Sequence, residues 1–137
     1  MLIMTVALVS LFFQSLEDFL NTDKRVVHFG DFNCVCETQD RSAPCQRRDN
    51  SSITLEYLTC RYYLSDVGAS RTFVTRFRHL QGSGHARLDR IYVSSCLLDH
   101  TFQYSVTPVS FSDHCLVTVK LVRRGADSLG PNGHFGN

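Results

Sequence analysis

Three short polar segments of this chain carry the residue types that could do chemistry. They are GDFN at 30–33, RLDRI at 87–91 and FSDH at 111–114, and together they supply three aspartates, one asparagine and one histidine. Carboxylate and amide oxygens suit a hard divalent cation, and a protonated imidazole can stabilise charge that develops on a phosphate. If the fold brings the segments together, the sequence predicts a site that handles a phosphate group.

The first segment places Asp31 and Asn33 directly after residues 25–29, which we predict to form a short buried strand. Strand side chains alternate with a period of two, so an extended Asp-x-Asn would direct both polar groups to one face. Asp31 could then orient or deprotonate a water, while Asn33 donates a hydrogen bond to a phosphate oxygen. The alternative is an Asx-turn, in which both residues satisfy nearby backbone groups.

The second segment indicates a buried carboxylate. Asp89 shares its predicted strand face with Ile91 and Val93, and a buried carboxylate costs free energy unless it is paired. The candidate partner is His114, which lies in a Ser-Asp-His turn just before the last predicted strand. A structural salt bridge to a nearby arginine, or an Asp89 that faces solvent, is the alternative. Asp113 could bind a metal or a metal-bound water.

The charge distribution allows DNA binding only through a local surface. The net charge is +1, with 14 basic and 13 acidic residues, so there is no bulk attraction to nucleic acid. Arginines and histidines between Arg71 and Arg90 interleave with two phenylalanines, and this cluster could follow a DNA backbone. A solvated hairpin explains the same pattern equally well.

Secondary-structure patterns must position these segments. Apolar residues at helical spacing predict a helix over 10–22, and a serine cap predicts a second from Ser51 or Ser52 to about Tyr63. The remainder is β-rich: we expect strands at 73–77 and 88–94 as a hairpin around 79–84, and further strands at 102–106 and 115–122. This order indicates an α+β fold with a mostly antiparallel sheet and helices on one side.

Length and composition are those of one globular domain. The chain has 137 residues, of which 43% are hydrophobic and 20% charged. We assign residues 1–122 to the domain and expect a disordered tail over 123–137, where Gly, Pro, Asn and Ser dominate. Met1–Phe13 is apolar but too short to span a membrane. Six irregularly spaced cysteines without a C-x-x-C pair favour reduced thiols over disulfides or zinc.

In this order and wording, the segments resemble motifs of the endonuclease/exonuclease/phosphatase superfamily. The matching stretches are VHFGDFN at 27–33, ARLDRIYVS at 86–94 and VSFSDH at 109–114, and the resemblance covers residues from about 12 to 122. Among the branches of the superfamily, the chain most resembles the second half of the apurinic-type endonuclease domain of LINE-type retrotransposons.

The resemblance implies half of a DNase I-like four-layer α/β sandwich and Mg²⁺-dependent cleavage of DNA phosphodiesters. It implies that Asp31 activates water, Asn33 holds the phosphate, Asp89 orients His114 toward the scissile phosphate and Asp113 assists the metal. The implied DNA contacts are Thr75, Arg76 and Arg87. The implied partners are DNA and the rest of a retrotransposon polyprotein, with no membrane.

The chain departs from the family pattern because the first half of the domain, with its metal-binding glutamate, is not recognisable in it. We therefore expect an impaired nuclease as an isolated chain, and whether it is an enzyme stays open at this point. A retroelement remnant without catalysis is one alternative. A small secreted disulfide-linked binding protein is another, and it rests on Met1–Phe13 and the cysteines. The resemblance favours the nucleus or cytoplasm over secretion.

Overall fold

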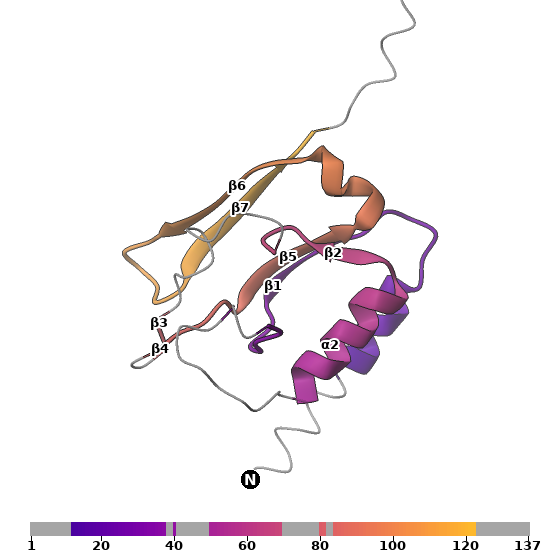
Figure 1. The fold of residues 1–137 in the computed structure, drawn as a ribbon, viewed down its shortest axis with the longest axis horizontal. Coiled ribbons are helices and arrows are strands. Elements are labelled where there is room, and N and C mark those ends of the chain that lie inside the picture. Colours follow the sequence, from indigo (N-terminus) through magenta and orange to yellow (C-terminus); the bar gives the residue numbers. More distant parts are fainter. Residues whose placement is uncertain (1–11, 38–39, 41–49, 70–79, 82–83, 123–137) are drawn as a thin grey trace, which may run out of the picture.

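The computed structural model describes residues 12–37, 40, 50–69, 80–81 and 84–122 (Figure 1). A helix over residues 12–20 comes first. The later elements are β1 (Val27–Asp31), α2 (Asn50–Arg61), β2 (Leu64–Asp66), β3 (Leu80–Gln81), β4 (Gly84–His85), β5 (Asp89–Ser94), the 3₁₀ helix η3 (Ser95–His100), β6 (Thr101–Pro108) and β7 (Cys115–Leu121). Both predicted helices and the last two predicted strands are therefore confirmed, with boundaries shifted by a few residues.

The central sheet has the order β1-β5-β2, and both neighbours of β5 run antiparallel to it. The strands β6 and β7 form a separate antiparallel pair that lies across one face of this sheet, whereas the helices cover the other face (Figure 1). Side chains of β5 alternate between these two sides, as a strand requires. The described residues thus form three layers: helices, central sheet and the β6–β7 pair.

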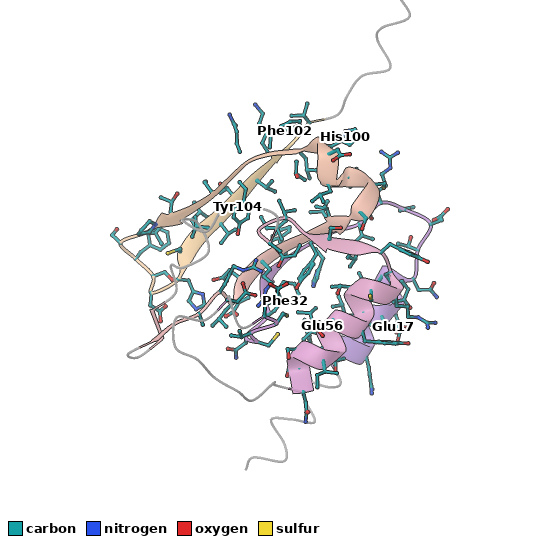
Figure 2. The ribbon with its side chains drawn as sticks, in the orientation of Figure 1. Glu17, Phe32, Glu56, His100, Phe102 and Tyr104 are labelled. Atoms are coloured by element: carbon teal, nitrogen blue, oxygen red, sulfur yellow. The ribbon has the colours of Figure 1, made fainter. Side chains whose placement is uncertain are left out.

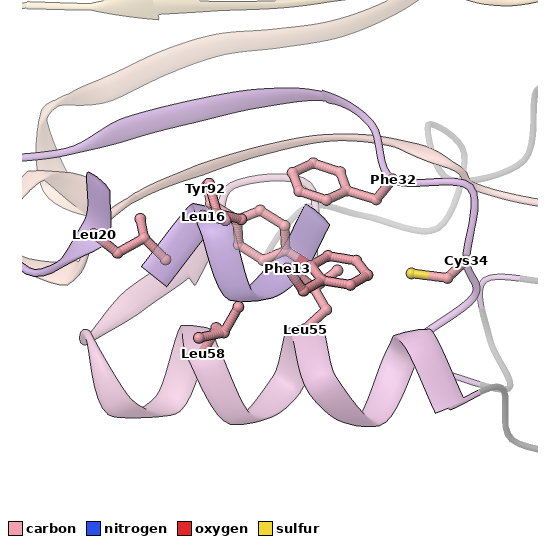
Figure 3. Close-up of a cluster of buried hydrophobic side chains, with 8 residues drawn as sticks. All are labelled: Phe13, Leu16, Leu20, Phe32, Cys34, Leu55, Leu58 and Tyr92. Atoms are coloured by element: carbon pink, nitrogen blue, oxygen red, sulfur yellow. The ribbon is translucent and has the colours of Figure 1, made fainter. Parts of the chain in front are cut away.

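The larger hydrophobic core lies between the helices and the central sheet (Figure 3). The first helix contributes Phe13, Leu16 and Leu20, whose spacing of three and four residues places them on one helical face. They pack with residues of α2 and with Phe32 and Tyr92, whose rings meet edge to face at 5.2 Å. This packing explains why the apolar spacing in the sequence was a reliable indicator of the helix.

A second core lies on the opposite face of the sheet. Val93 and Ile91 of β5 and Val67 are buried there and pack against side chains of β6 and β7, including Tyr104 and Val117. Figure 2 shows Tyr104 on the β6–β7 side of the sheet and Phe32 on the helix side. The face that Asp89 shares with Ile91 is therefore a core face, as the sequence predicted.

Two strand predictions are wrong in detail. The strand at β1 is not buried, since Phe29 is 71% exposed and Val27 is 41% exposed. The strand at β5 does not form a hairpin with 73–77, because β1 and β2 occupy both of its edges. Residues 73–77 themselves lie outside the described residues. Alternation of apolar and polar residues predicts that a strand forms, but it does not predict which strand lies beside it.

Four charged side chains form a buried ion network between β5 and the loops around it. The Arg87 Nε donates to Asp40 Oδ1 at 2.9 Å, and its Nη1 donates to Asp66 Oδ1 at 3.0 Å. The Arg90 Nη1 donates to the Cys34 carbonyl at 2.8 Å, and its Nη2 lies 3.4 Å from Asp40 Oδ2. Two positive and two negative charges balance within this network, which is what allows them to be buried.

The described residues contain no helix that is long and apolar enough to cross a membrane. Among the described residues, the cysteines at positions 34, 36, 60, 96 and 115 form no disulfide, and Cys45 lies outside the described part of the chain. The predicted tail over 123–137 also lies outside it.

We predict that Asp40→Ala destabilises the protein strongly, because it leaves Arg87 and Arg90 buried with too little negative charge. Removing one partner of a buried ion pair costs about 3–5 kcal/mol, which urea unfolding followed by circular dichroism would measure. The control is Arg61→Ala, which breaks an exposed pair with Glu17 and should cost no more than about 1 kcal/mol. Equal losses in the two variants would contradict this view of the network.

Candidate active site

The pairing of β1 with β5 places two carboxylates directly opposite each other. In this antiparallel register Asp31 is the cross-strand partner of Asp89, and the pair lies at the end of both strands. Like charges in this position repel each other and destabilise a sheet unless a cation compensates them. The geometry therefore creates a local demand for positive charge.

His114 meets that demand from the turn before β7. Its Nδ1 lies 2.9 Å from Asp89 Oδ2, and its Nε2 lies 3.8 Å from Asp31 Oδ2. The contact between Asp89 and His114, predicted from the sequence, is thus present. One potential ligand atom from each of the three residues lies within 4.8 Å of the others, so the group could hold either a proton or a metal ion.

The carboxylates raise the pKa of His114 above its ordinary value. The largest cause is the hydrogen bond with Asp89, followed by the charges of Asp89, Asp31 and Asp113, which together outweigh partial desolvation. The protonated form stabilises the folded state, so this contribution is fully present below pH 6.5 and is lost as the pH rises through the raised pKa. Because 37% of the side chain is exposed, solvent screens the effect.

Asn33 adopts a left-handed backbone conformation with φ of 48°, and its N–H donates to Asp31 Oδ1 at 2.8 Å. This is the Asx-turn that the sequence left open as an alternative. Gly30, with φ of 151°, sits in a region that favours glycine. The Asn33 side chain is exposed, so the backbone role and a phosphate contact are compatible.

The turn that carries His114 is stabilised by its own serine. The His114 N–H donates to Ser112 Oγ at 3.0 Å, so Ser112 has a structural role in the turn. Asp113 is exposed and is not a member of the three-residue ligand group. Its charge nevertheless acts on His114, so a supporting role near a metal stays a prediction.

The predicted DNA contacts divide into two groups. Thr75 and Arg76 lie outside the described residues. Arg87 lies within them, but its side chain is only 5% exposed and is bonded to Asp40 and Asp66. A phosphate contact from Arg87 would require these ion pairs to break, so its position favours a structural role.

Sequence reasoning missed Asp40, which holds the segment that leads into β5. Its carbonyl accepts the Arg87 N–H at 2.8 Å, and its carboxylate binds the same residue's guanidinium. Asp40 lies between the predicted strand at 25–29 and the second predicted helix, where the sequence predicted no residue of the site. A buried arginine needs an acidic partner, but spacing along the sequence does not identify that partner.

We predict that removing the charge of each of the three aspartates lowers the pKa of His114, and that the size of the decrease differs among them. Asp89→Asn should lower it most, Asp31→Asn less and Asp113→Asn least, because that is the order of their interactions with the imidazole. Proton or ¹⁵N NMR titration of the His114 ring would measure each value. An unchanged His114 pKa in Asp89→Asn would contradict the assigned contact.

The geometry supports chemistry on an anionic substrate. An imidazolium held between carboxylates can donate a hydrogen bond to a phosphate oxygen, and a carboxylate at a strand end can accept a proton from water. Asp31 has the greater freedom for this, since 42% of its side chain is exposed against 18% for Asp89.

Comparison with known proteins agrees with this assignment. Residues 5–114 match the endonuclease/exonuclease/phosphatase family model. The chain is 31% identical over 134 residues to the transposon TX1 uncharacterized 149 kDa protein of Xenopus laevis, and the match covers 92% of this chain but 10% of that protein.

Two solved structures are similar in fold. The endonuclease domain of TRAS1, a telomere-specific non-LTR retrotransposon, has a TM-score of 0.65 and 17% identity, with 85% of this chain and 53% of that domain covered. The 3′ phosphatase NExo from Neisseria, bound to a product DNA hairpin, has a TM-score of 0.64 and 18% identity, with 84% and 52% covered. The chain thus spans about half the length of each solved relative.

These likenesses confirm the predicted fold class, a DNase I-like α/β arrangement with antiparallel sheets and flanking helices. The family match covers most of the chain and includes all three polar segments of the site. The chain therefore belongs to the endonuclease/exonuclease/phosphatase family.

Proposed function

We propose that this chain carries half of a Mg²⁺-dependent DNA-nicking site derived from a non-LTR retrotransposon endonuclease. The observation that supports this most directly is the Asp31–His114–Asp89 arrangement, found in a chain that belongs to a phosphodiester-cleaving family. The similarity to a transposon protein and to a retrotransposon endonuclease domain favours DNA as the substrate.

Each site residue has a role that follows from its position. His114, whose protonated form is favoured by the hydrogen bond with Asp89, donates a hydrogen bond to the scissile phosphate and stabilises the charge that develops there. Asp31, the more exposed carboxylate, orients the attacking water and accepts its proton. Asn33 supplies an amide donor to a phosphate oxygen. Thr75 and Arg76 are better candidates for DNA contacts than Arg87, whose side chain is buried in ion pairs with Asp40 and Asp66.

The donor set fits a magnesium ion in part. Mg²⁺ prefers oxygen ligands and an octahedral shell, and Asp31 and Asp113 can offer carboxylate oxygens. His114 is a poor ligand while it is protonated, and Asp89 Oδ2 is occupied by His114. When bound, the ion would polarise the phosphate and neutralise charge on the leaving group. Two exposed carboxylates would bind Mg²⁺ weakly, which favours low nuclease activity for this chain by itself.

A catalytically dead remnant of the same fold is the competing proposal. It is favoured by the donor set, since Asp89 Oδ2 is engaged by His114 and the carboxylates left for a metal ion, Asp31 and Asp113, are exposed. Both proposals share the fold and the imidazole–carboxylate contact, so only measured cleavage separates them.

We predict that the chain nicks supercoiled plasmid slowly under single-turnover conditions with excess protein and Mg²⁺, and that EDTA abolishes the nicking. His114→Ala should reduce the rate by about 10²-fold, because it removes a preorganised donor to the phosphate. Asp31→Asn should have a comparable effect through loss of the base. Agarose gels that separate supercoiled from open-circular DNA would provide the rates.

Matched controls exclude trace nuclease contamination. His100→Ala and Asp18→Asn change the same residue types outside the site, and they should cleave at the rate of the unaltered chain. The absence of Mg²⁺-dependent nicking from the unaltered chain, or equal rates for His114→Ala and His100→Ala, would favour the remnant.

A further inference from the structure

Two cysteines lie close together in the segment that follows β1. Cys34 is buried in the larger hydrophobic core, and its sulfur is directed toward the core side chains (Figure 3). Cys36 is only half-buried, and it packs against the same core. One thiol is therefore shielded from solvent, while the other is within reach of small solutes.

The surroundings of Cys36 stabilise its thiolate. The largest contribution is a hydrogen bond that the Cys34 thiol donates to the Cys36 sulfur, and the Tyr92 hydroxyl donates another. The charge of the Arg90 guanidinium adds to them. Together they outweigh burial and the charge of Asp40, and they lower the pKa of Cys36 to about 7. A partly exposed thiol with positive charge nearby is the environment of reactive cysteines.

Cys36 also lines a cavity of about 140 Å³. A water molecule needs roughly 10–15 Å³ of such space, so a molecule as small as hydrogen peroxide fits inside. The charged groups of the lining are four carboxylates and one guanidinium, which belong to Glu37, Asp40, Glu56, Asp66 and Arg87. This excess of negative charge repels an anionic oxidant such as oxidised glutathione, whereas it does not repel an uncharged hydroperoxide.

We propose that Cys36 is a peroxide-reactive thiol and that Cys34 converts its oxidised form into a Cys34–Cys36 disulfide. The Cys36 thiolate attacks one oxygen of hydrogen peroxide, the O–O bond breaks and hydroxide leaves, so that Cys36 becomes a sulfenic acid. The proton that Cys36 released converts this hydroxide to water. The Cys34 sulfur then attacks the Cys36 sulfur, the S–O bond breaks, and the hydroxyl group leaves with the Cys34 proton as a second water. Two thiols are thereby oxidised by two electrons, and the peroxide is reduced.

The spacing of the two residues permits this bridge. Residues two apart in the chain have Cα atoms at most about 7 Å apart, and disulfides commonly join Cα atoms about 4.4–6.8 Å apart. Cys60 and Cys96 are more exposed than Cys36, yet neither lines the cavity. They are therefore internal controls for oxidation that depends on exposure alone.

The test treats the folded 137-residue chain with hydrogen peroxide at pH 7, blocks the remaining thiols with an alkylating reagent in urea, and weighs tryptic peptides by mass spectrometry. Residues 26–41 form one tryptic peptide, which carries Cys34 and Cys36 and no other cysteine. We expect this peptide to lose two hydrogen atoms and to escape alkylation, while the peptides of Cys60 and Cys96 are mostly alkylated. Oxidised glutathione at the same concentration should form the bridge at least about tenfold more slowly, because the carboxylates repel it.

Two variants separate the roles of Cys34. Cys34→Ser keeps a hydrogen-bond donor but cannot form the bridge, so a sulfenic acid should persist at Cys36 and react with dimedone. Cys34→Ala also removes the donor and should slow the oxidation of Cys36 about threefold, because the smaller thiolate fraction outweighs the gain in nucleophilicity. Cys60→Ser is the matched control and should form the bridge at the unaltered rate. Circular dichroism would verify that each variant is folded.

A peptide 26–41 that stays reduced while Cys60 or Cys96 is oxidised would overturn the inference, and so would a bridge that forms only in urea. Faster bridging with oxidised glutathione than with hydrogen peroxide would overturn the choice of oxidant. None of these measurements uses DNA cleavage, so their outcome is independent of the proposed function.

Discussion

The antiparallel pairing of β1 with β5 is the contact on which both the fold and the site depend. It places Asp31 opposite Asp89, and it sets which side chains of β5 face the helices and which face β6 and β7. Two carboxylates in this position would repel each other without a nearby cation. The turn before β7 places His114 next to both carboxylates. The stability of this end of the sheet and the candidate chemistry therefore depend on the same interaction between the imidazole and the two aspartates.

The buried network of two arginines and two aspartates is a second charge balance, and it lies next to the site in the sequence and the fold. Arg87 and Arg90 flank Asp89 in sequence, yet they bind Asp40, Asp66 and the Cys34 carbonyl rather than the site carboxylates. These buried cations are already neutralised by other groups, and among the described residues the Asp89 carboxylate contacts the His114 imidazole. The two arginines hold the strand in place, and the histidine remains accessible enough to meet a substrate.

The architecture also explains how a chain that spans about half the length of the solved relatives holds the three site residues together. Helix packing on one face of the central sheet buries a substantial core, and the β6–β7 pair buries a second. Each of the site residues Asp31, Asp89 and His114 is attached to one of these packed strands. Within the part of the chain that the structure describes, a groove lined by apolar side chains remains between β1 and β7.

The sequence by itself determined the elements and the candidate residues, because helical spacing, strand alternation and the three polar segments are local patterns. It also predicted the Asp89–His114 contact, since a carboxylate on a core face needs a partner. Tertiary structure alone decided that β5 lies between β1 and β2, that Phe29 is exposed, and that Arg87 is paired with Asp40. Strand neighbours and ion partners are set by contacts between residues distant in the chain, and a one-dimensional pattern does not encode which of several charged or apolar residues will meet.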